Sequence, residues 1–124
     1  MLLHLEQPDY DHVLRGADGR SAKVNDRVLV ASFVLSPTRL LENWPVVDIR
    51  TVTVADLEPL WALEPELILL GSGATQAFPP AQVLAASLGR GIGLESMTNA
   101  AAARTFNVLA SEGRRVVAGF VLGS

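Results

Sequence analysis

The chain has no cysteine and little of the other chemistry that catalytic or nucleic-acid-binding proteins rely on. Without cysteine there is no disulfide framework, no thiolate nucleophile and no cysteine-ligated zinc or iron–sulfur centre. Charged residues make up only 19% of the sequence and the net charge is −3, so no basic field attracts nucleic acid or anionic lipid. We therefore expect no nucleic-acid partner and no thiol-based activity.

Long hydrophobic runs are also missing. The longest strongly apolar run, 28–35, is far shorter than the roughly 20 residues that a membrane-spanning helix needs. The first residues carry no basic stretch, and Glu6 and Pro8 interrupt them at once, unlike a signal or transit peptide. We therefore expect a cytoplasmic protein without direct membrane insertion.

Aliphatic residues are what the sequence does contain in quantity. Hydrophobic residues make up 49% of the 124 residues, and aromatic residues only 6%. A chain of this length buries roughly two-thirds of the surface that it exposes when unfolded, so it can build a core without metal or disulfide bonds. We find no internal repeat, low-complexity tract or linker, and we expect residues 1–124 to form a single domain.

The first third of the chain has the pattern of β-strands. Segments 12–15 and 21–24 flank a glycine-containing turn at 16–19, which predicts an antiparallel hairpin. Segment 27–35 is β-branched or apolar at nearly every position, which predicts one strand buried on both faces. A further short strand is expected at 46–49.

The rest of the chain alternates between helices and strands. Thr53 and Asp56 have the spacing of a capping box, and Pro59 limits the helix that follows to one or two turns. The remaining strands are expected at 67–70, 91–97 and 116–122, and the remaining helices at 81–88 and from Thr98 or Asn99 to Gly113. This order favours right-handed crossovers and predicts an α/β domain with a mixed, largely parallel sheet and an N-terminal antiparallel hairpin.

The last helix is expected to be amphipathic. Its apolar stripe consists of Ala102, Phe106 and Leu109, and the residues on the opposite side are Arg104, Asn107 and Ser111. The stripe therefore packs on the sheet, and the polar side faces solvent.

A candidate ligand site lies where a strand ends in Gly71, Ser72 and Gly73. Doubly wound sheets bind ligands at such positions, because glycine lets backbone N–H groups approach an anion. The spacing matches neither a dinucleotide fingerprint nor a phosphate loop, and the other interpretation is a tight turn that needs a positive φ. Thr98 and Asn99, at a helix start, are further anion candidates or an ordinary N-cap. Both loops are expected at the same edge of the sheet.

Metal and nucleophile chemistry have weak support. The potential metal ligands His4, Asp9, Asp11 and His12 have no regular spacing, and we interpret them as solvated residues at a strand entrance. A nucleophilic Ser72 or Ser111 needs a positioned base, and the only two histidines lie near the N-terminus. The nucleophile elbow Gly-x-Ser-x-Gly is also absent. We expect no metal and no cofactor, and the balance is against an enzyme.

Five residues are candidate contacts for a protein partner: Trp44, Trp61, Arg104, Arg114 and Arg115. Tryptophan is favoured at interfaces, and the three arginines together would form a local basic spot for an acidic partner. The alternatives are that the tryptophans anchor the core and that the arginines complement the carboxyl end of a helix.

The carboxyl-terminal third resembles the closing motif of a small family of domains of unknown function. The matching residues are Glu95 to Met97, Asn99, Ala102, Thr105 to Asn107, Leu109 and Glu112 to Arg114. The family includes archaeal and bacterial stand-alone proteins, the human adipogenesis-associated domain protein and a mitochondrial assembly factor of respiratory complex I. Segment 69–73 resembles its Gly-Thr-Gly strand exit, and the order and distances of the motifs extend the match over nearly the whole chain.

The resemblance implies a three-layer α/β domain with a central mixed sheet, and it supplies no established catalytic residues. The best-described role in the family, that of the mitochondrial member, is to help assemble a membrane complex through protein contacts. Ser72 and Asn99 stand where the family has threonine, and both keep a short polar side chain. Phe106 replaces a tyrosine, and this loss weakens any mechanism that used its hydroxyl.

Two function classes follow from these observations. The first is a non-enzymatic protein-interaction or assembly module with an unidentified protein partner, which predicts an exposed apolar or tryptophan-bearing patch. The alternative is a small-molecule or anion-binding protein, including an unrecognised enzyme, with a cleft at Gly71–Gly73 and Thr98–Asn99. Self-association through an edge strand or near Trp44 is a third possibility, which light scattering would test because the sequence does not set the oligomeric state.

Overall fold

The computed structural model describes residues 12–123, which begin with a small antiparallel sheet. Its strands are β1 (Leu14–Ala17), β2 (Ala22–Val24) and β3 (Arg27–Leu29), in that order across the sheet. The predicted N-terminal hairpin is confirmed, with Ala17 opposite Ala22. The Asp18 carboxylate closes the turn, because it accepts hydrogen bonds of 2.8 Å from the backbone N–H groups of Arg20 and Ser21.

The large sheet has the order β5-β4-β8-β6-β7. Its strands are β4 (Phe33–Leu35), β5 (Leu40–Glu42), β6 (Leu67–Gly71), β7 (Gly93–Met97) and β8 (Val116–Phe120). β6 pairs in parallel with both β7 and β8, whereas β4 is antiparallel to β5 and β8. The sheet is therefore mixed, and its parallel half joins the segments that alternate with helices in the sequence.

Within residues 12–123, three α-helices and one short 3₁₀ helix complete the fold. They are η1 (Ile49–Thr51), α1 (Val54–Trp61), α2 (Ala81–Gly89) and α3 (Asn99–Ser111). The predicted capping box of α1 is confirmed, because Thr53 Oγ1 accepts from the Asp56 N–H at 3.2 Å and the Asp56 carboxylate accepts from the Thr53 N–H at 2.9 Å. Thr98, not Asn99, caps α3, and its side chain accepts from the N–H of Ala101.

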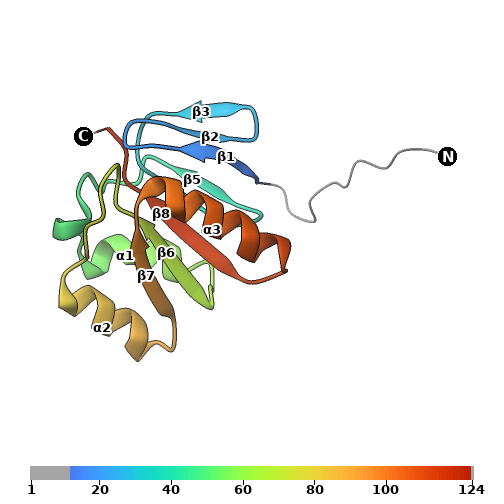
Figure 1. Cartoon of the computed structure of the whole chain (residues 1–124). Helices are drawn as coiled ribbons and strands as arrows, with labels where there is room; N and C mark the ends of the chain where they lie inside the picture. Colours follow the sequence, from blue (N-terminus) through green and yellow to red (C-terminus); the bar gives the residue numbers. More distant parts are fainter. Residues whose placement is uncertain (1–11, 124) are drawn as a thin grey trace.

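The elements form three layers (Figure 1). On one face of the large sheet, buried side chains of α3 and the small sheet, such as Phe106 and Val24, pack against Phe33 and Phe120, whose rings stack with centroids 5.0 Å apart. On the other face lie α1, α2 and the segment 44–52. The expected mixed α/β architecture is confirmed.

The prediction of one continuous strand over 27–35 is wrong. The segment divides into β3 and β4, which belong to different sheets, and Val28 and Val30 are 63% and 70% exposed. Ser32 lies at the crossing, where its hydroxyl accepts from the N–H of Leu122 at 3.0 Å and its carbonyl accepts from the N–H of Trp44 at 2.9 Å. Ser32, the polar residue within this apolar run, thus forms hydrogen bonds where the chain passes from the small sheet to the large sheet.

Two further expectations need correction. The strand expected at 46–49 is absent, because Asp48 caps η1 there with a hydrogen bond to the Arg50 N–H, while β5 forms earlier in the chain. Asn107 does not face solvent opposite the apolar stripe of α3. Its amide accepts from the Leu14 N–H at 3.1 Å and donates to the Leu14 carbonyl at 2.7 Å, so it pairs with β1 as a neighbouring strand would.

Candidate functional site

The carboxyl ends of the parallel strands β6, β7 and β8 lie side by side, at Gly71, Met97 and Phe120. The two loops singled out in the sequence leave the first two of these ends and are joined to each other. The Asn99 N–H donates to the Gly73 carbonyl at 2.9 Å, and the Asn99 Oδ1 accepts from the Gly73 N–H at 3.0 Å. The loops therefore open on the same edge of the sheet.

Asn99 is fully buried and holds this edge together. Its Nδ2 donates to the carbonyls of Asp18 at 2.7 Å and Val121 at 2.8 Å. The side chain thus connects α3 to the β1–β2 turn, the loop after β6 and the segment after β8. Both side-chain amide hydrogens of Asn99 are thus bonded within the fold, so the residue has a structural role. Its position in the sequence does not reveal this role.

The two glycines at the end of β6 allow this close packing around Asn99. A Cβ at Gly71 would collide with Asn99 Oδ1 and with the Phe120 ring, which lies 2.8 Å from the ideal Cβ position. Gly73 has φ +103°, in the left-handed region that favours glycine. Ser72 donates from its hydroxyl toward the carbonyls of Thr75 and Met97 and accepts from the N–H of Ala77 at 3.1 Å. Its hydroxyl organises the loop.

A cleft of about 570 Å³ lies next to Ser72, between η1 and the loop after β6. Its lining residues are Val47, Asp48, Arg50, Ser72, Ala74, Thr75, Gln76, Ala77, Phe78 and Val121. Of the five ligand candidates named from the sequence, Ser72 lines it, whereas Gly71, Gly73, Thr98 and Asn99 do not. Of the loop residues named from the sequence, Ser72 alone therefore contributes to the lining of this cleft.

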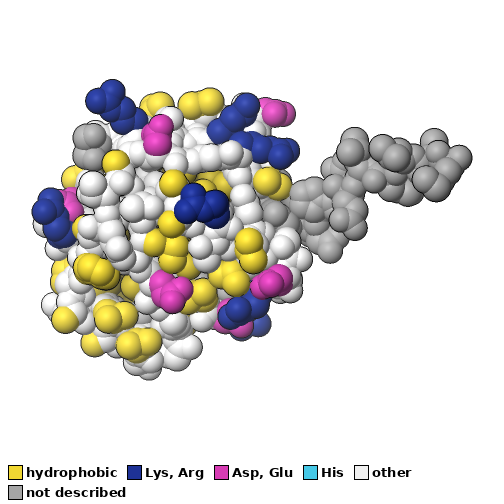
Figure 2. Space-filling view, in the orientation of Figure 1, with side chains coloured by type: hydrophobic (Ala, Val, Ile, Leu, Met, Phe, Trp, Pro, Cys, Tyr) yellow, Lys and Arg dark blue, Asp and Glu magenta, His cyan; other side chains and the backbone are white. Residues whose placement is uncertain are grey.

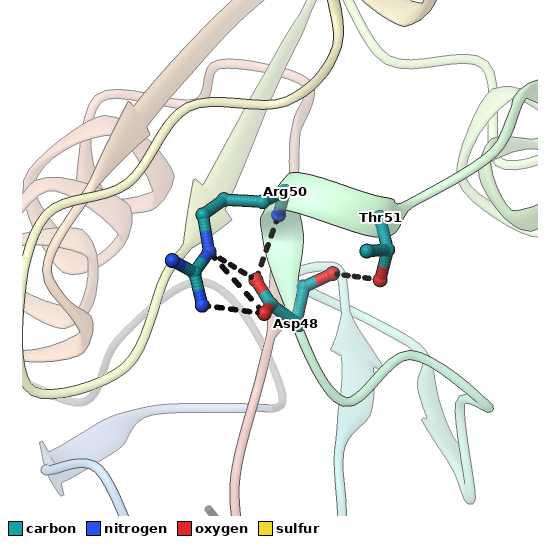
Figure 3. Close-up of polar contacts among 3 residues, drawn as sticks. All are labelled: Asp48, Arg50 and Thr51. Carbon is teal, nitrogen blue, oxygen red and sulfur yellow. Dashed lines mark hydrogen bonds and ion pairs between the residues drawn. The ribbon is translucent and has the colours of Figure 1, made fainter.

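Asp48 and Arg50 are the charged groups of the cleft, and they face each other (Figure 3). The Arg50 Nη2 and the Asp48 Oδ2 are 2.8 Å apart. Hydrogen bonds from the Arg50 side chain and backbone hold the pKa of Asp48 below its ordinary value, and Asp48 in turn raises the pKa of Arg50. The cleft is therefore nearly neutral, with one guanidinium already paired.

The tryptophans named as candidate contacts are both buried. The Trp44 Nε1 donates to the Asp56 carbonyl at 2.9 Å, and the Trp61 Nε1 donates to the Ser87 hydroxyl at 3.3 Å. The Arg90 guanidinium lies 4.1 Å from the centroid of the Trp61 ring. Trp44 thus connects the segment after β5 to α1, and Trp61 connects α1 to α2.

The three candidate arginines differ in their surroundings. Arg114 donates to the Glu66 carboxylate at 3.0 Å, and Arg115 donates from its side chain to the Glu64 carbonyl at 3.3 Å. Arg104, on α3, is exposed and makes no hydrogen bond or ion pair with any residue from 12 to 123. The basic spot expected from the sequence is therefore partly neutralised by Glu66.

An exposed apolar surface lies over α2 and β7, and we call it the α2–β7 patch (Figure 2). Phe78, Leu84 and Leu88 are 67%, 37% and 57% exposed. A hollow of about 370 Å³ runs along it, lined by Phe78, Pro79, Leu84, Leu94, Glu95, Ser96 and Met97. The signal in the sequence was the helix 81–89 itself, which carries Leu84 and Leu88 in addition to the buried Val83.

Other kinds of site find no support in the described chain. No group of three or more histidine or acidic side chains between residues 12 and 123 is placed to hold a metal ion. The potential ligands His4, Asp9 and Asp11 lie outside the described residues. Within the same range, no helix is long and apolar enough to cross a membrane.

A bacterial and a human protein are similar in sequence to this chain. A "13 kDa major membrane protein" of Francisella tularensis subsp. holarctica is 32% identical over 84 residues, which cover 67% of this chain and 68% of that protein. The human NADH dehydrogenase (ubiquinone) 1 alpha subcomplex assembly factor 3 is 36% identical over 87 residues, or 65% of this chain and 47% of that protein. The chain thus spans about half the length of the human protein.

Solved structures and a family sequence model agree with these matches. A Xanthomonas campestris protein, determined by NMR in a structural genomics programme, superposes with a TM-score of 0.84 at 56% identity, covering 99% of this chain and 93% of that one. The sequence model described as "Protein of unknown function (DUF498/DUF598)" matches residues 14–121. The chain therefore belongs to the DUF498/DUF598 family.

Proposed function

We propose that this chain is a non-enzymatic, cytoplasmic protein-interaction module that helps other proteins assemble. The observation that carries the proposal is the α2–β7 patch, in which Phe78 and Leu88 are each more than half exposed. Contiguous exposed apolar surface on a small domain marks an interaction site, because leaving it in water costs free energy that a partner would recover. The similarity to a human assembly factor supports the same class of function.

Purification of tagged protein from its native cells after brief cross-linking tests this proposal. The wild type should recover a defined set of proteins, and the double variant Phe78→Ser, Leu88→Gln should lose most of them. The matched control is Val108→Gln on α3, since Val108 is 55% exposed but lies outside the patch. Equal recovery by the wild type and the patch variant, or no specific protein with either, would contradict the proposal.

A second candidate is the binding of a small molecule in the cleft at η1, supported by its position at the carboxyl ends of parallel strands. Because Arg50 is already paired with Asp48, the cleft suits a small polar or zwitterionic molecule better than a multiply charged anion. Ser72 and the residues from Ala74 to Phe78 would form one wall of this cleft. Neither proposal assigns a catalytic residue or a cofactor.

Thermal-shift measurements with inorganic phosphate and with glycine distinguish these ligand classes. Binding at about 100 times the dissociation constant adds roughly 2.7 kcal/mol of stability and raises Tm. We expect a shift with glycine that Arg50→Gln abolishes. The absence of a shift with either probe, or a shift that Arg50→Gln preserves, would count against the cleft as the binding site for these ligands.

A further inference from the structure

We propose that the open edge of β7 accepts an extended segment of a partner protein as an additional strand, with apolar residues on its α2 side and basic residues on its α3 side. This inference rests on the proposed interaction function and specifies the partner. It combines three features of one strand: backbone groups without a partner among residues 12–123, an apolar hollow beside Leu94, and the carboxylate of Glu95, a residue that also lines the hollow.

The backbone of β7 is available on one side. β7 ends the large sheet and, among residues 12–123, pairs only with β6. Gly93 donates its N–H to the Glu66 carbonyl at 3.2 Å, and the Met97 carbonyl accepts from Ser72 at 2.8 Å, so these residues point inward. Since strand residues alternate, the backbone groups of Leu94 and Ser96 point outward.

The loop after β6 limits this edge without closing it. Gln76 donates from its side chain to the Ser96 carbonyl at 3.2 Å, and the Ser96 hydroxyl donates to the Ala77 carbonyl. Among residues 12–123, no other residue bonds the N–H and carbonyl of Leu94 or the N–H of Ser96, so these three groups are left at the edge. Three backbone groups suit a short added strand, whose main-chain bonds supply affinity while side-chain positions supply specificity.

The face of the edge toward α2 is apolar. Leu94 belongs to the side of the sheet that packs on α1 and α2, and with Phe78 and Leu84 it lines the 370 Å³ hollow. A residue of an added strand on this face would therefore meet Phe78, Leu84 and Leu94, although Glu95 and Ser96 of β7 also line the hollow. Aliphatic side chains fit there, and their burial would cover part of Phe78, which is 67% exposed.

The opposite face carries a single charge at the edge. Glu95 lies opposite Leu69 in the register, on the α3 side, and is exposed. Its carboxylate makes no hydrogen bond or ion pair with any described residue. An arginine or lysine opposite it forms a favourable cross-strand pair, and the net charge of −3 favours a basic partner as well.

The same charge disfavours a second copy of this chain. An antiparallel pairing of two β7 edges that uses both Leu94 and Ser96 places Glu95 directly opposite its equivalent. Like charges in that position destabilise a strand pair. A partner strand in which aliphatic and basic residues alternate meets both faces without this conflict.

Binding of short fluorescent peptides to the purified chain, followed by anisotropy, tests the proposal. The first peptide alternates valine and arginine, and the second alternates valine and glutamate. We expect the arginine peptide to bind more tightly to the wild type, and Glu95→Lys to weaken it on the order of fivefold to tenfold and to reverse the preference. Glu112→Lys makes the same charge change at an exposed site on the end of α3 and should leave the preference unchanged.

Peptides N-methylated at one alternate set of residues test the main-chain bonds. Strand addition predicts that methylation of the backbone nitrogens of one set abolishes binding, whereas methylation of the other set does not. The sensitive set is the valines if the added strand is antiparallel to β7, and the arginines if it is parallel. The proposal would be overturned by equal effects of methylation on both sets, or by a Glu95→Lys chain that still prefers the arginine peptide. Glu95 would then serve only to prevent aggregation through the edge of β7. Concentration-dependent dimers that Glu95→Lys alters would overturn it in favour of a second copy.

The outcome separates this proposal from the broader one. If the Phe78→Ser, Leu88→Gln variant loses its cellular partners while Glu95→Lys keeps them and no peptide binds, the interaction module stands and the added strand is wrong. If no cellular partner depends on the patch, the proposed function itself is wrong.

Discussion

Asn99 shows how one side chain determines the form of the candidate site. Its three hydrogen bonds to Gly73, Asp18 and Val121 connect segments that are far apart in the sequence. A short polar residue at a helix start reads equally well as a cap or as an anion contact. The sequence pattern contains no information on which carbonyl groups will surround it, so its structural role could not be predicted.

We expect Asn99→Ala to lower the free energy of unfolding by on the order of 3 kcal/mol or more, because each buried backbone group left without a partner costs about 1–3 kcal/mol. Urea unfolding measures this. Ser111→Ala, which removes an exposed hydroxyl bonded to the Val108 carbonyl, should stay within about 0.5 kcal/mol of the wild type. A loss below about 1 kcal/mol for Asn99→Ala would contradict the role assigned to this side chain.

Glu66 makes stability depend on pH. Its carboxylate accepts hydrogen bonds from the Arg114 side chain and from the backbone N–H of Arg115. These bonds hold the pKa of Glu66 below the ordinary value of 4.5. A carboxylate with a lowered folded-state pKa stabilises the fold above its unfolded-state pKa, and this contribution disappears as the pH falls through the folded-state value. Stability should therefore decline as the pH drops below about 4.5.

The variant Glu66→Gln should show a shallower decline than the wild type in urea unfolding between about pH 5 and pH 3. Arg114→Gln should flatten the curve in the same direction, because it removes the main cause of the shift. Parallel pH curves for the wild type and Glu66→Gln would show that this pair does not contribute. The effect is small, because both side chains are well exposed.

At the scale of elements, capping is the feature that the sequence predicted best. Thr53→Ala should lower the free energy of unfolding by about 1 kcal/mol, since it removes the acceptor for the Asp56 N–H at the start of α1. Thermal unfolding checks this against Thr51→Ala, which removes only a hydroxyl bonded to the Asp48 carbonyl in η1. Equal Tm values for the two variants would contradict the capping role.

Local signals explain why α1, α2, α3 and the parallel strands could be predicted. Caps, proline positions and the apolar stripe through Phe106 act within a few residues of the chain. The division of 27–35 between two sheets is different, because it depends on Ser32 meeting Trp44 and Leu122. Asn107 was misplaced for the same reason: its partner Leu14 is 93 residues away.

At the scale of the whole molecule, the two candidate surfaces meet at the loop after β6. The cleft at η1 and the α2–β7 patch share Phe78 and lie on either side of the loop after β6. The sequence predicted that the loops after β6 and β7 open together at the ends of the parallel strands, as the hydrogen bonds between Gly73 and Asn99 show. It predicted an exposed apolar or tryptophan-bearing patch but not the residues that form it, because exposed leucines and core leucines look alike until the layers are known.

Hydrogen exchange of the chain, alone and with a partner captured from its native cells, tests the central claim most directly. Binding at the patch predicts slower exchange from Phe78 to Met97, with the amides of Leu94 and Ser96 protected most and the exposed edge at Val28 unchanged. The claim would be contradicted if Leu94 and Ser96 exchanged as in the free chain and protection were confined to the cleft at Asp48 and Arg50, or to β3.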